Sequence, residues 1–500
     1  MNSAGRTIAK NASVMMGSQI ITWGLTLIIT VLLPRYLGAA GIGKYQLAAS
    51  LWTIMGLFVT FGMDTLLTKE ISRDPGRLSD LFSASVLLRA GLFLTSFVLL
   101  AGYAQLAGYP QDTKEVIYIF ALTCIFGQLV AVCRASLQGL ERMEFISLGD
   151  IAQKTLFTTV AIILLLKGFG LLVIAVVEGG GALASLVVQY YALNRIHRVQ
   201  FRFNRQLISG MLQASFPYLL LVGFQIVYSQ IDVVVISLLV SEKQIGWYSS
   251  ALRLTGTFVF VPTVLMTALL PASSRMHQNA PEDLRKLTSK GFDLLLLACI
   301  PIGLGVMSIA NQLVVFLYGA DFANGGPILA LMGIVVIFFS INMLVGQFFI
   351  SSDRQRVWVV VMAAATLITV PLDLVLVPWC QSAFGNGALG GALSYLVTEG
   401  GMVIFGLIML PKGMLGWKNG WLALRATIAG LAMAAVVWQL RHYFIVVPIG
   451  AGIVVYLAGV LALRLIPQED WSIVRSLAVR ALGRLRKDKQ RPATISQPIE

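Results

Sequence analysis

The chain has 500 residues, of which 57% are hydrophobic and only 12% are charged. Soluble domains usually carry about a quarter charged residues, so this composition excludes a water-soluble enzyme. It also excludes a nucleic-acid-binding role for the net charge of +14. The four cysteines have no CxxC spacing, and we expect neither a disulfide framework nor a metal or cofactor site. The composition predicts an all-α polytopic membrane protein.

Fourteen apolar stretches are long enough to cross a bilayer, whose hydrocarbon core of about 30 Å needs roughly 20 helical residues. In chain order they are residues 11–33, 42–63, 81–103, 116–132, 146–166, 171–192, 216–240, 245–270, 294–318, 328–350, 357–378, 388–410, 421–440 and 444–465. The loops between them are short, which leaves no extramembrane catalytic domain. Function must therefore lie among the helices.

Lysine and arginine in the connecting segments predict the orientation. If both termini are cytoplasmic, cytoplasmic segments hold 28 basic residues and outer loops hold six. Cytoplasmic loops of membrane proteins carry such an excess, so we expect a multi-pass protein of the cytoplasmic (inner) membrane. After Pro467, apolar residues at helical spacing alternate with arginines. This pattern predicts an amphipathic helix on anionic membrane lipids; the alternative is a solvated basic tail that only enforces topology.

Matching motifs recur in the same order in two parts of the chain. Residues 43–45 (Gly-Lys-Tyr) open the second predicted span as residues 246–248 (Gly-Trp-Tyr) open the eighth, and Glu-Gly-Gly occurs at 178–180 and 399–401. We expect two six-helix lobes, 1–205 and 206–415, followed by two added helices, 416–466, and a basic tail, 467–500. Six helices per unit make a parallel repeat, which commonly places a substrate site between halves. The alternative is a duplication with no moving parts.

Six charged residues stand well inside predicted spans: Arg89, Glu178, Asp232, Arg253, Asp373 and Glu399. A charge at mid-membrane costs about 2.5–3.5 kcal/mol on insertion scales, so such residues usually pair or serve a function. One interpretation is a set of structural ion pairs, such as Asp232 with Arg253. The other is a hydrated cavity with arginines for an anionic cargo and carboxylates for a coupling cation.

Several motifs resemble the polysaccharide transporters of the multidrug/oligosaccharidyl-lipid/polysaccharide exporter superfamily. They are Tyr36-Leu37-Gly38 with Gly43-Lys44-Tyr45, residues 137–142 (Leu-Gln-Gly-Leu-Glu-Arg), 229–232 (Ser-Gln-Ile-Asp), 246–253, and 317–322 (Leu-Tyr-Gly-Ala-Asp-Phe). The likeness extends over essentially the whole chain. It implies a flippase of the O-antigen type that moves a polyprenyl-pyrophosphate-linked oligosaccharide to the outer leaflet by alternating access, with H⁺ or Na⁺ coupling.

The resemblance also implies site residues and partners. A pyrophosphate favours arginine or lysine, so Arg89 and Arg253 are the first candidates for binding it, with Arg35 and Lys44 at the outer mouth. Asp232, Glu178, Asp373 and Glu399 are the candidates for ion coupling. Expected partners are lipid-linked oligosaccharide, membrane lipids, a polysaccharide polymerase and glycosyltransferases.

Three alternatives remain open. A multidrug/cation antiporter of the same superfamily would favour a carboxylate-rich cavity, but usually has twelve helices. A lipid II flippase is the second alternative. Those relatives carry cavity arginines in their first helix, whereas the first span of this chain has no charge between Asn11 and Leu33. A membrane polysaccharide polymerase or ligase needs a substantial outer loop, and the predicted loops are too short for one.

Overall fold

The computed structural model describes residues 3–202, 204–266, 281–352, 354–411 and 413–465. All regular structure in these ranges is helical, which confirms the all-α prediction. The amphipathic helix predicted after Pro467 lies outside the described residues.

The first two predicted spans form one element, α1 (Ser3–Thr60), which is broken at Gly38. Gly38 has φ 68° and ψ 176°, a positive φ that glycine adopts without steric cost. The residues expected to form the first outer loop, 34–41, are instead helical on both sides of this break. The chain therefore passes from the first to the second span through a single sharply turned residue.

A short helix that was not predicted follows α1. This helix, α2 (Met63–Arg73), is too short to span a bilayer and buries Met63, Leu66, Leu67 and Ile71 along one face. The first half continues with η1 (Pro75–Arg77), α3 (Leu78–Leu106), α4 (Gln111–Gly139), α5 (Met143–Leu166) and α6 (Leu171–Ile196).

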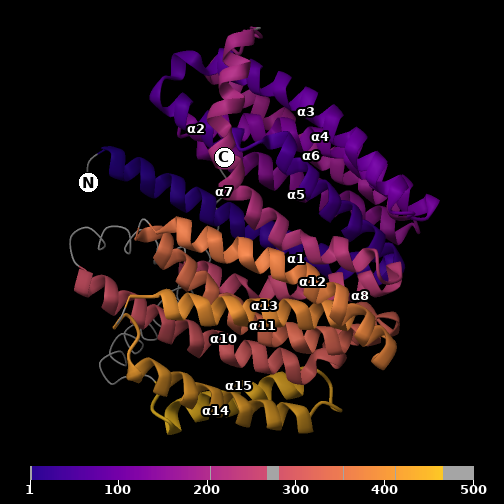
Figure 1. Cartoon of the computed structure of the whole chain (residues 1–500), viewed down its shortest axis with the longest axis vertical. Helices are drawn as coiled ribbons and strands as arrows, with labels where there is room; N and C mark the ends of the chain where they lie inside the picture. Colours follow the sequence, from indigo (N-terminus) through magenta and orange to yellow (C-terminus); the bar gives the residue numbers. More distant parts are fainter. Residues whose placement is uncertain (1–2, 203, 267–280, 353, 412, 466–500) are drawn as a thin grey trace, which may run out of the picture.

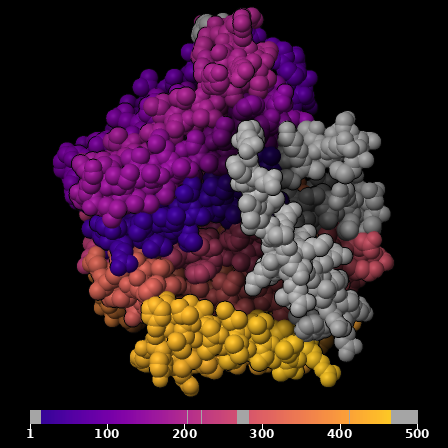
Figure 2. Space-filling model, turned by 180° about the vertical axis from the view of Figure 1, so that it is seen from behind, coloured from indigo at the N-terminus to yellow at the C-terminus, as the bar shows by residue number. Residues whose placement is uncertain are grey.

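The second half begins with α7 (Arg205–Ser237), which bends by 55° between Leu220 and Val222. It continues with α8 (Glu242–Phe258), α10 (Pro281–Tyr318), η2 (Ala320–Gly325), α11 (Gly326–Ser351), α12 (Gln355–Phe384) and α13 (Ala388–Met409). The last two helices, α14 (Trp417–Gln439) and α15 (Val446–Ala462), pack together and against α10. They form the outermost layer, at the opposite end of the molecule from α2–α6 (Figures 1 and 2).

By length and composition, eleven helices in the described part of the chain could cross a membrane. The bent α7 makes a twelfth if its two parts are one span, and α15 is apolar but shorter. This count treats α1 as one helix despite its break at Gly38. The multi-pass character is confirmed, whereas the number of fourteen spans stays a prediction.

The two halves share their largest apolar core at the end of the helices near Gly38. The largest buried cluster combines residues on both sides of the α1 break, such as Leu33 and Ile42, with Ile245, Phe322 and Ile328 of the second half. Toward the other end the core divides. One cluster belongs to α2–α6 with Met211 of α7, and another to α10, α11 and α13–α15 with Met266. The first part of α7 thus packs on the first half at that end, where a Cβ on Gly62 would lie 2.5 Å from the backbone nitrogen of Leu219. The main core between the halves lies at the end near Gly38, which is called the joined end below.

At the joined end, α1 crosses α8 through two glycines. A Cβ on Gly43 would lie 2.0 Å from the carbonyl oxygen of Glu242, and one on Gly246 would lie 1.8 Å from that of Ala39. Each glycine thus packs against the backbone of the other helix, and neither position has room for a side chain. Gly43 and Gly246 are the residues that the sequence repeat aligns with each other.

We expect Gly246→Ala to destabilise this crossing, because overpacking a tight contact typically costs about 1–3 kcal/mol. The matched control is Gly256→Ala in the same helix, where a Cβ meets nothing within 4 Å. The thermal unfolding of the two purified variants should differ, with only Gly246→Ala melting below wild type. Equal melting temperatures would show that the crossing is not close-packed.

Candidate functional site

Three carboxylates are buried together in the second half. Asp232 on α7, Asp373 on α12 and Glu399 on α13 have exposed fractions of 7%, 0% and 1%. Among the described residues, no basic side chain lies within ion-pair distance of any of them. The group is therefore an acidic cluster without an arginine or lysine to neutralise it.

Polar but uncharged side chains surround part of this cluster. Glu399 accepts hydrogen bonds from the Tyr228 hydroxyl at 2.7 Å and from Asn342 Nδ2 at 2.7 Å. Asp232 accepts one from the Tyr248 hydroxyl at 3.0 Å.

The remaining carboxylate oxygens of the cluster have few or no hydrogen-bond donors. Oδ1 of Asp232 is buried without a hydrogen-bond partner in the described chain. Asp373 is fully buried with only the Ser394 hydroxyl as a nearby donor, and the Asp232 carboxylate is a like charge close to it. Buried anions in this state favour uptake of a proton or a small cation. No group of three or more metal-ligating His, Cys, Asp or Glu side chains forms within the described ranges.

The fourth acid, Glu178 on α6, lies in the first half and has a different setting. It accepts a hydrogen bond from the Tyr45 hydroxyl at 2.5 Å. The guanidinium of Arg253 lies 4.9 Å from the centre of the Tyr45 ring, a cation–π contact. Glu178 and Glu399, which the repeat aligns, thus both bind a tyrosine hydroxyl, although Tyr45 and Tyr228 are not aligned positions.

Arg253 connects the second half to α1. Its Nε and Nη2 donate to Gln46 Oε1 at 3.2 and 3.0 Å. The ion pair with Asp232 that the sequence allowed does not form, because Asp232 binds Tyr248 while Arg253 extends toward α1. Arg253 therefore lies at the junction between the two halves. Its partners are the Gln46 amide and the Tyr45 ring, and no carboxylate pairs with it in the described part of the chain.

Arg89 lies elsewhere, on α3 in the first half, with a side chain that is 1% exposed. It forms an ion pair with Asp64 of α2 and donates to the backbone oxygen of Gln128 of α4 at 2.9 Å. This arginine thus has a carboxylate partner in the structure. The structure links Arg89 to α2 and α4, and gives it no contact with Arg253 or the acidic cluster.

The outer-mouth candidates lie at the joined end. Arg35 is exposed. Lys44 is mostly buried and forms ion pairs with Asp112 at the start of α4 and, at 3.2 Å, with Glu242 at the start of α8. Lys44 therefore connects the two halves directly.

A second connection at this end was missed by sequence reasoning. Asp321 of η2 accepts the backbone N–H of Ala39 at 2.9 Å and pairs with Lys243 at 2.6 Å. The break at Gly38 leaves N–H groups without helical partners, and the Asp321 carboxylate satisfies one of them from the other half. The only sequence signal was the position of Asp321 in the loop motif at 317–322.

The tyrosines around the acids were also missed, although two left a signal. Tyr228 precedes Asp232 by four residues, and Tyr395 precedes Glu399 by four. Side chains at this spacing share a helix face, so each acid has an aromatic neighbour inside its span. Tyr45, Tyr248 and Asn342 come from other helices, and only the fold brings them to their carboxylates.

Comparison with known proteins identifies the family of this chain. The family described as "Polysaccharide biosynthesis protein" matches residues 8–277, more than half of the chain, and the family described as MatE matches residues 217–375. A curated relative from Haloferax volcanii, the probable low-salt glycan biosynthesis flippase Agl15, is 23% identical over 221 residues. That alignment covers 43% of this chain and 44% of the relative.

Solved structures share the fold at low sequence identity. The lipid II flippase MurJ in an inward closed conformation gives a TM-score of 0.71 at 16% identity, covering 91% of this chain and 99% of that one. An inward-facing multidrug resistance MATE transporter gives 0.63 at 14% identity, covering 77% and 93%, and an outward-facing one gives 0.51 at 14%, covering 80% and 95%. The chain belongs to the polysaccharide biosynthesis protein family, within the multidrug/oligosaccharidyl-lipid/polysaccharide exporter superfamily.

Proposed function

We propose that the protein is a flippase that moves a polyprenyl-pyrophosphate-linked oligosaccharide across the cytoplasmic membrane for surface polysaccharide biosynthesis. The observation that carries the proposal, beside family membership, is the large apolar core that both halves share near Gly38, beyond which the helices divide into one core for α2–α6 with the first part of α7 and another for α10, α11 and α13–α15. Two lobes joined at one end are what alternating access requires of one of its states. The proposed lobes are residues 1–205 and 206–415, with fourteen spans in all and residues 416–466 added as a pair of helices.

The contacts at the joined end suit a gate. Lys44–Glu242 and Ala39–Asp321 both run between the lobes and lie at least partly in reach of solvent. Both contacts are polar and partly exposed, so water can replace them when the lobes part. The basic-residue distribution assigns this end to the outside, which makes the described state closed outward.

We further propose that Arg253 binds the pyrophosphate. It lies between the lobes and has no carboxylate partner, so an anion can take up its charge. We also propose that Arg89 binds the phosphate. It would exchange its present counter-ion, Asp64, for the phosphate. Arg35 and Lys44 receive the headgroup at the outer mouth once the gate opens.

The acidic cluster is the proposed coupling site. Asp232, Asp373 and Glu399 would bind H⁺ or Na⁺ in the second lobe, and Glu178 would respond through Tyr45 and Arg253. Because Arg253 lies beside Tyr45, a change at Glu178 reaches the proposed pyrophosphate ligand through one aromatic ring. Loss or gain of a cation then changes the charge near the cargo.

The alternative is a multidrug/cation antiporter, favoured by the MatE match over residues 217–375, the region that holds Asp232 and Asp373. Both functions are tested in cells that lack this protein. The flippase predicts that lipid-linked oligosaccharide accumulates on the cytoplasmic side while surface polysaccharide disappears, with drug sensitivity unchanged. Normal glycolipid together with new sensitivity to cationic drugs would support the antiporter instead.

Neutralising the acidic cluster should abolish coupling and leave the fold intact. We expect Asp373→Asn to retain or raise thermal stability, since it removes a buried charge without a basic partner, and to lose gradient-driven transport. Purified wild-type protein should melt at a higher temperature when Na⁺ replaces a bulky organic cation, or when the pH is lowered, and the variant should lose that response. Asp283→Asn, at an exposed position paired with Lys286, serves as the control. An unchanged response in Asp373→Asn would refute the coupling site.

The two arginines should behave differently. Arg253→Gln should fold normally and reduce glycolipid transport by roughly tenfold or more, the loss expected for a charge-assisted contact of about 1.4 kcal/mol. Arg89→Gln should lower expression because it leaves Asp64 without its partner.

The double variant Arg89→Gln/Asp64→Asn separates the two possible roles of Arg89. It should recover expression in either case, because no lone charge remains. Transport that recovers along with expression would show that Arg89 is only structural, whereas transport that stays low supports contact with the cargo. In the same assay, wild-type transport by Arg253→Gln would refute the role of that residue.

A further inference from the structure

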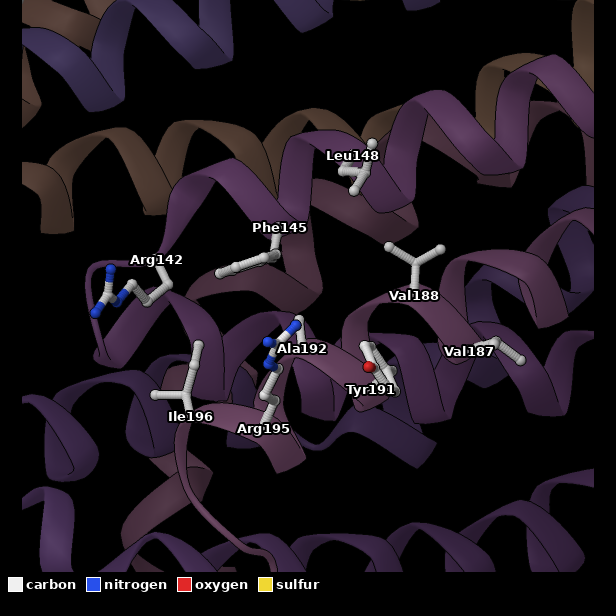
Figure 3. A pocket seen from close by; sticks show the side chains of 9 residues that line it. All are labelled: Arg142, Phe145, Leu148, Val187, Val188, Tyr191, Ala192, Arg195 and Ile196. Atoms are coloured by element: carbon white, nitrogen blue, oxygen red, sulfur yellow. The ribbon is translucent and has the colours of Figure 1, made fainter.

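An open groove lies between α5 and α6 in the first lobe, away from the acids and arginines described above. Its volume is about 600 Å³, and it opens to the surroundings of the protein. The groove has two different ends, as Figure 3 shows: Arg142 and Arg195 lie toward one end, and Leu148 and Val187 toward the other.

The apolar part of the groove is exposed along its length. Leu148, Val187 and Tyr191 are 54%, 60% and 66% exposed, and they lie on facing sides of the two helices. Beneath them the helices are in close contact, because a Cβ on Gly149 would lie 2.6 Å from Gln189 Nε2. The groove is therefore a shallow channel with a closed floor, of roughly 12 Å along α6 at 1.5 Å per residue.

Of the two arginines at the basic end, one is weakly paired and the other has no partner among the described residues. Arg142 makes one long contact with Glu144, at 3.5 Å, and is half exposed. Arg195 has neither an ion pair nor a hydrogen bond from its side chain among the described residues. The nearby acid Asp150 is already paired with Arg134. Two guanidinium groups at the end of an apolar channel match a phosphate that continues into a hydrocarbon chain.

We propose that this groove binds an anionic phospholipid of the cytoplasmic leaflet. The phosphodiester lies between Arg142 and Arg195, and one acyl chain lies against Leu148, Val187 and Tyr191. The predicted orientation places this end, where α5 begins and α6 ends, at the cytoplasmic surface, where anionic lipids and basic pockets between helices meet.

The position of the groove argues for a resident lipid and against the cargo. Both of its walls belong to the first lobe, so the groove keeps its shape when the two lobes move apart. A transported molecule must instead contact surfaces that exchange between the two states. The bound lipid would hold the first lobe at a constant depth in the inner leaflet while the second lobe moves.

Site-specific crosslinking tests the proposal on the purified full-length protein. Phosphatidylglycerol with a photoreactive acyl chain should label peptides of α5 and α6, and unlabelled phosphatidylglycerol should compete roughly tenfold better than phosphatidylcholine with the same chains. Arg142→Gln/Arg195→Gln should lose most of this labelling. The control Arg73→Gln/Arg77→Gln removes the same charge from two exposed arginines of the same predicted surface and should label as wild type does.

The remaining outcomes also decide the question. Equal competition by phosphatidylcholine would show a site for acyl chains alone, and undiminished labelling of the double variant would show that the arginines do not bind the phosphate; either result overturns the proposal. Preferential displacement by a polyprenyl pyrophosphate would assign the groove to the cargo and also overturns it. Leu148→Trp, which fills the apolar part and keeps both charges, should lose labelling and retain the fold.

Discussion

The close crossing of α1 and α8 is the contact on which the rest of the structure depends. Gly43 and Gly246 let each helix rest on the backbone of the other, and packing this tight leaves no room for a side chain or water. The shared apolar core, the Lys44 bridge and the Asp321 cap all lie around this crossing. In the proposed transport cycle, this crossing is the contact that opens when the lobes part.

Buried charges are stabilised in two different ways on the two sides of this crossing. Arg89 has a carboxylate, Asp64, and is held as part of the first lobe. The acids of the second lobe have tyrosine hydroxyls and an asparagine amide, which can donate hydrogen bonds but cannot neutralise charge. The first arrangement favours a fixed structure, while the second suits the proposed coupling cation. Arg253 falls between the two, since Gln46 and the Tyr45 ring orient it without cancelling its charge.

The two proposed lipid sites both use arginine to bind a phosphate, but one site moves during transport and the other does not. A lipid phosphate that is to be moved should meet arginine where the lobes separate, as at Arg253. A lipid phosphate that is to stay should meet arginine on a surface that does not change, as at Arg142 and Arg195. The apolar channel beside the second pair has a closed floor because Gly149 draws α5 and α6 together. Glycines thus serve the proposed gate and the groove through the same effect, the close approach of two helices.

The sequence by itself determined the class of the protein, its helices and its candidate charges. Hydrophobicity and helical length are local properties, so the apolar stretches, the aligned glycines at 43 and 246 and the six intramembrane charges could be read from the chain. The sequence did not reveal α2, because its short amphipathic pattern resembles a loop beside a span. It also did not reveal that the first outer loop is reduced to Gly38. Only the tertiary structure decided which charges meet: Arg89 with Asp64, Lys44 with Glu242, and Asp232 with Tyr248 in place of Arg253. Such pairings depend on the rotation and depth of helices far apart in the chain, and one helical turn, about 5.4 Å, is enough to exchange one partner for another.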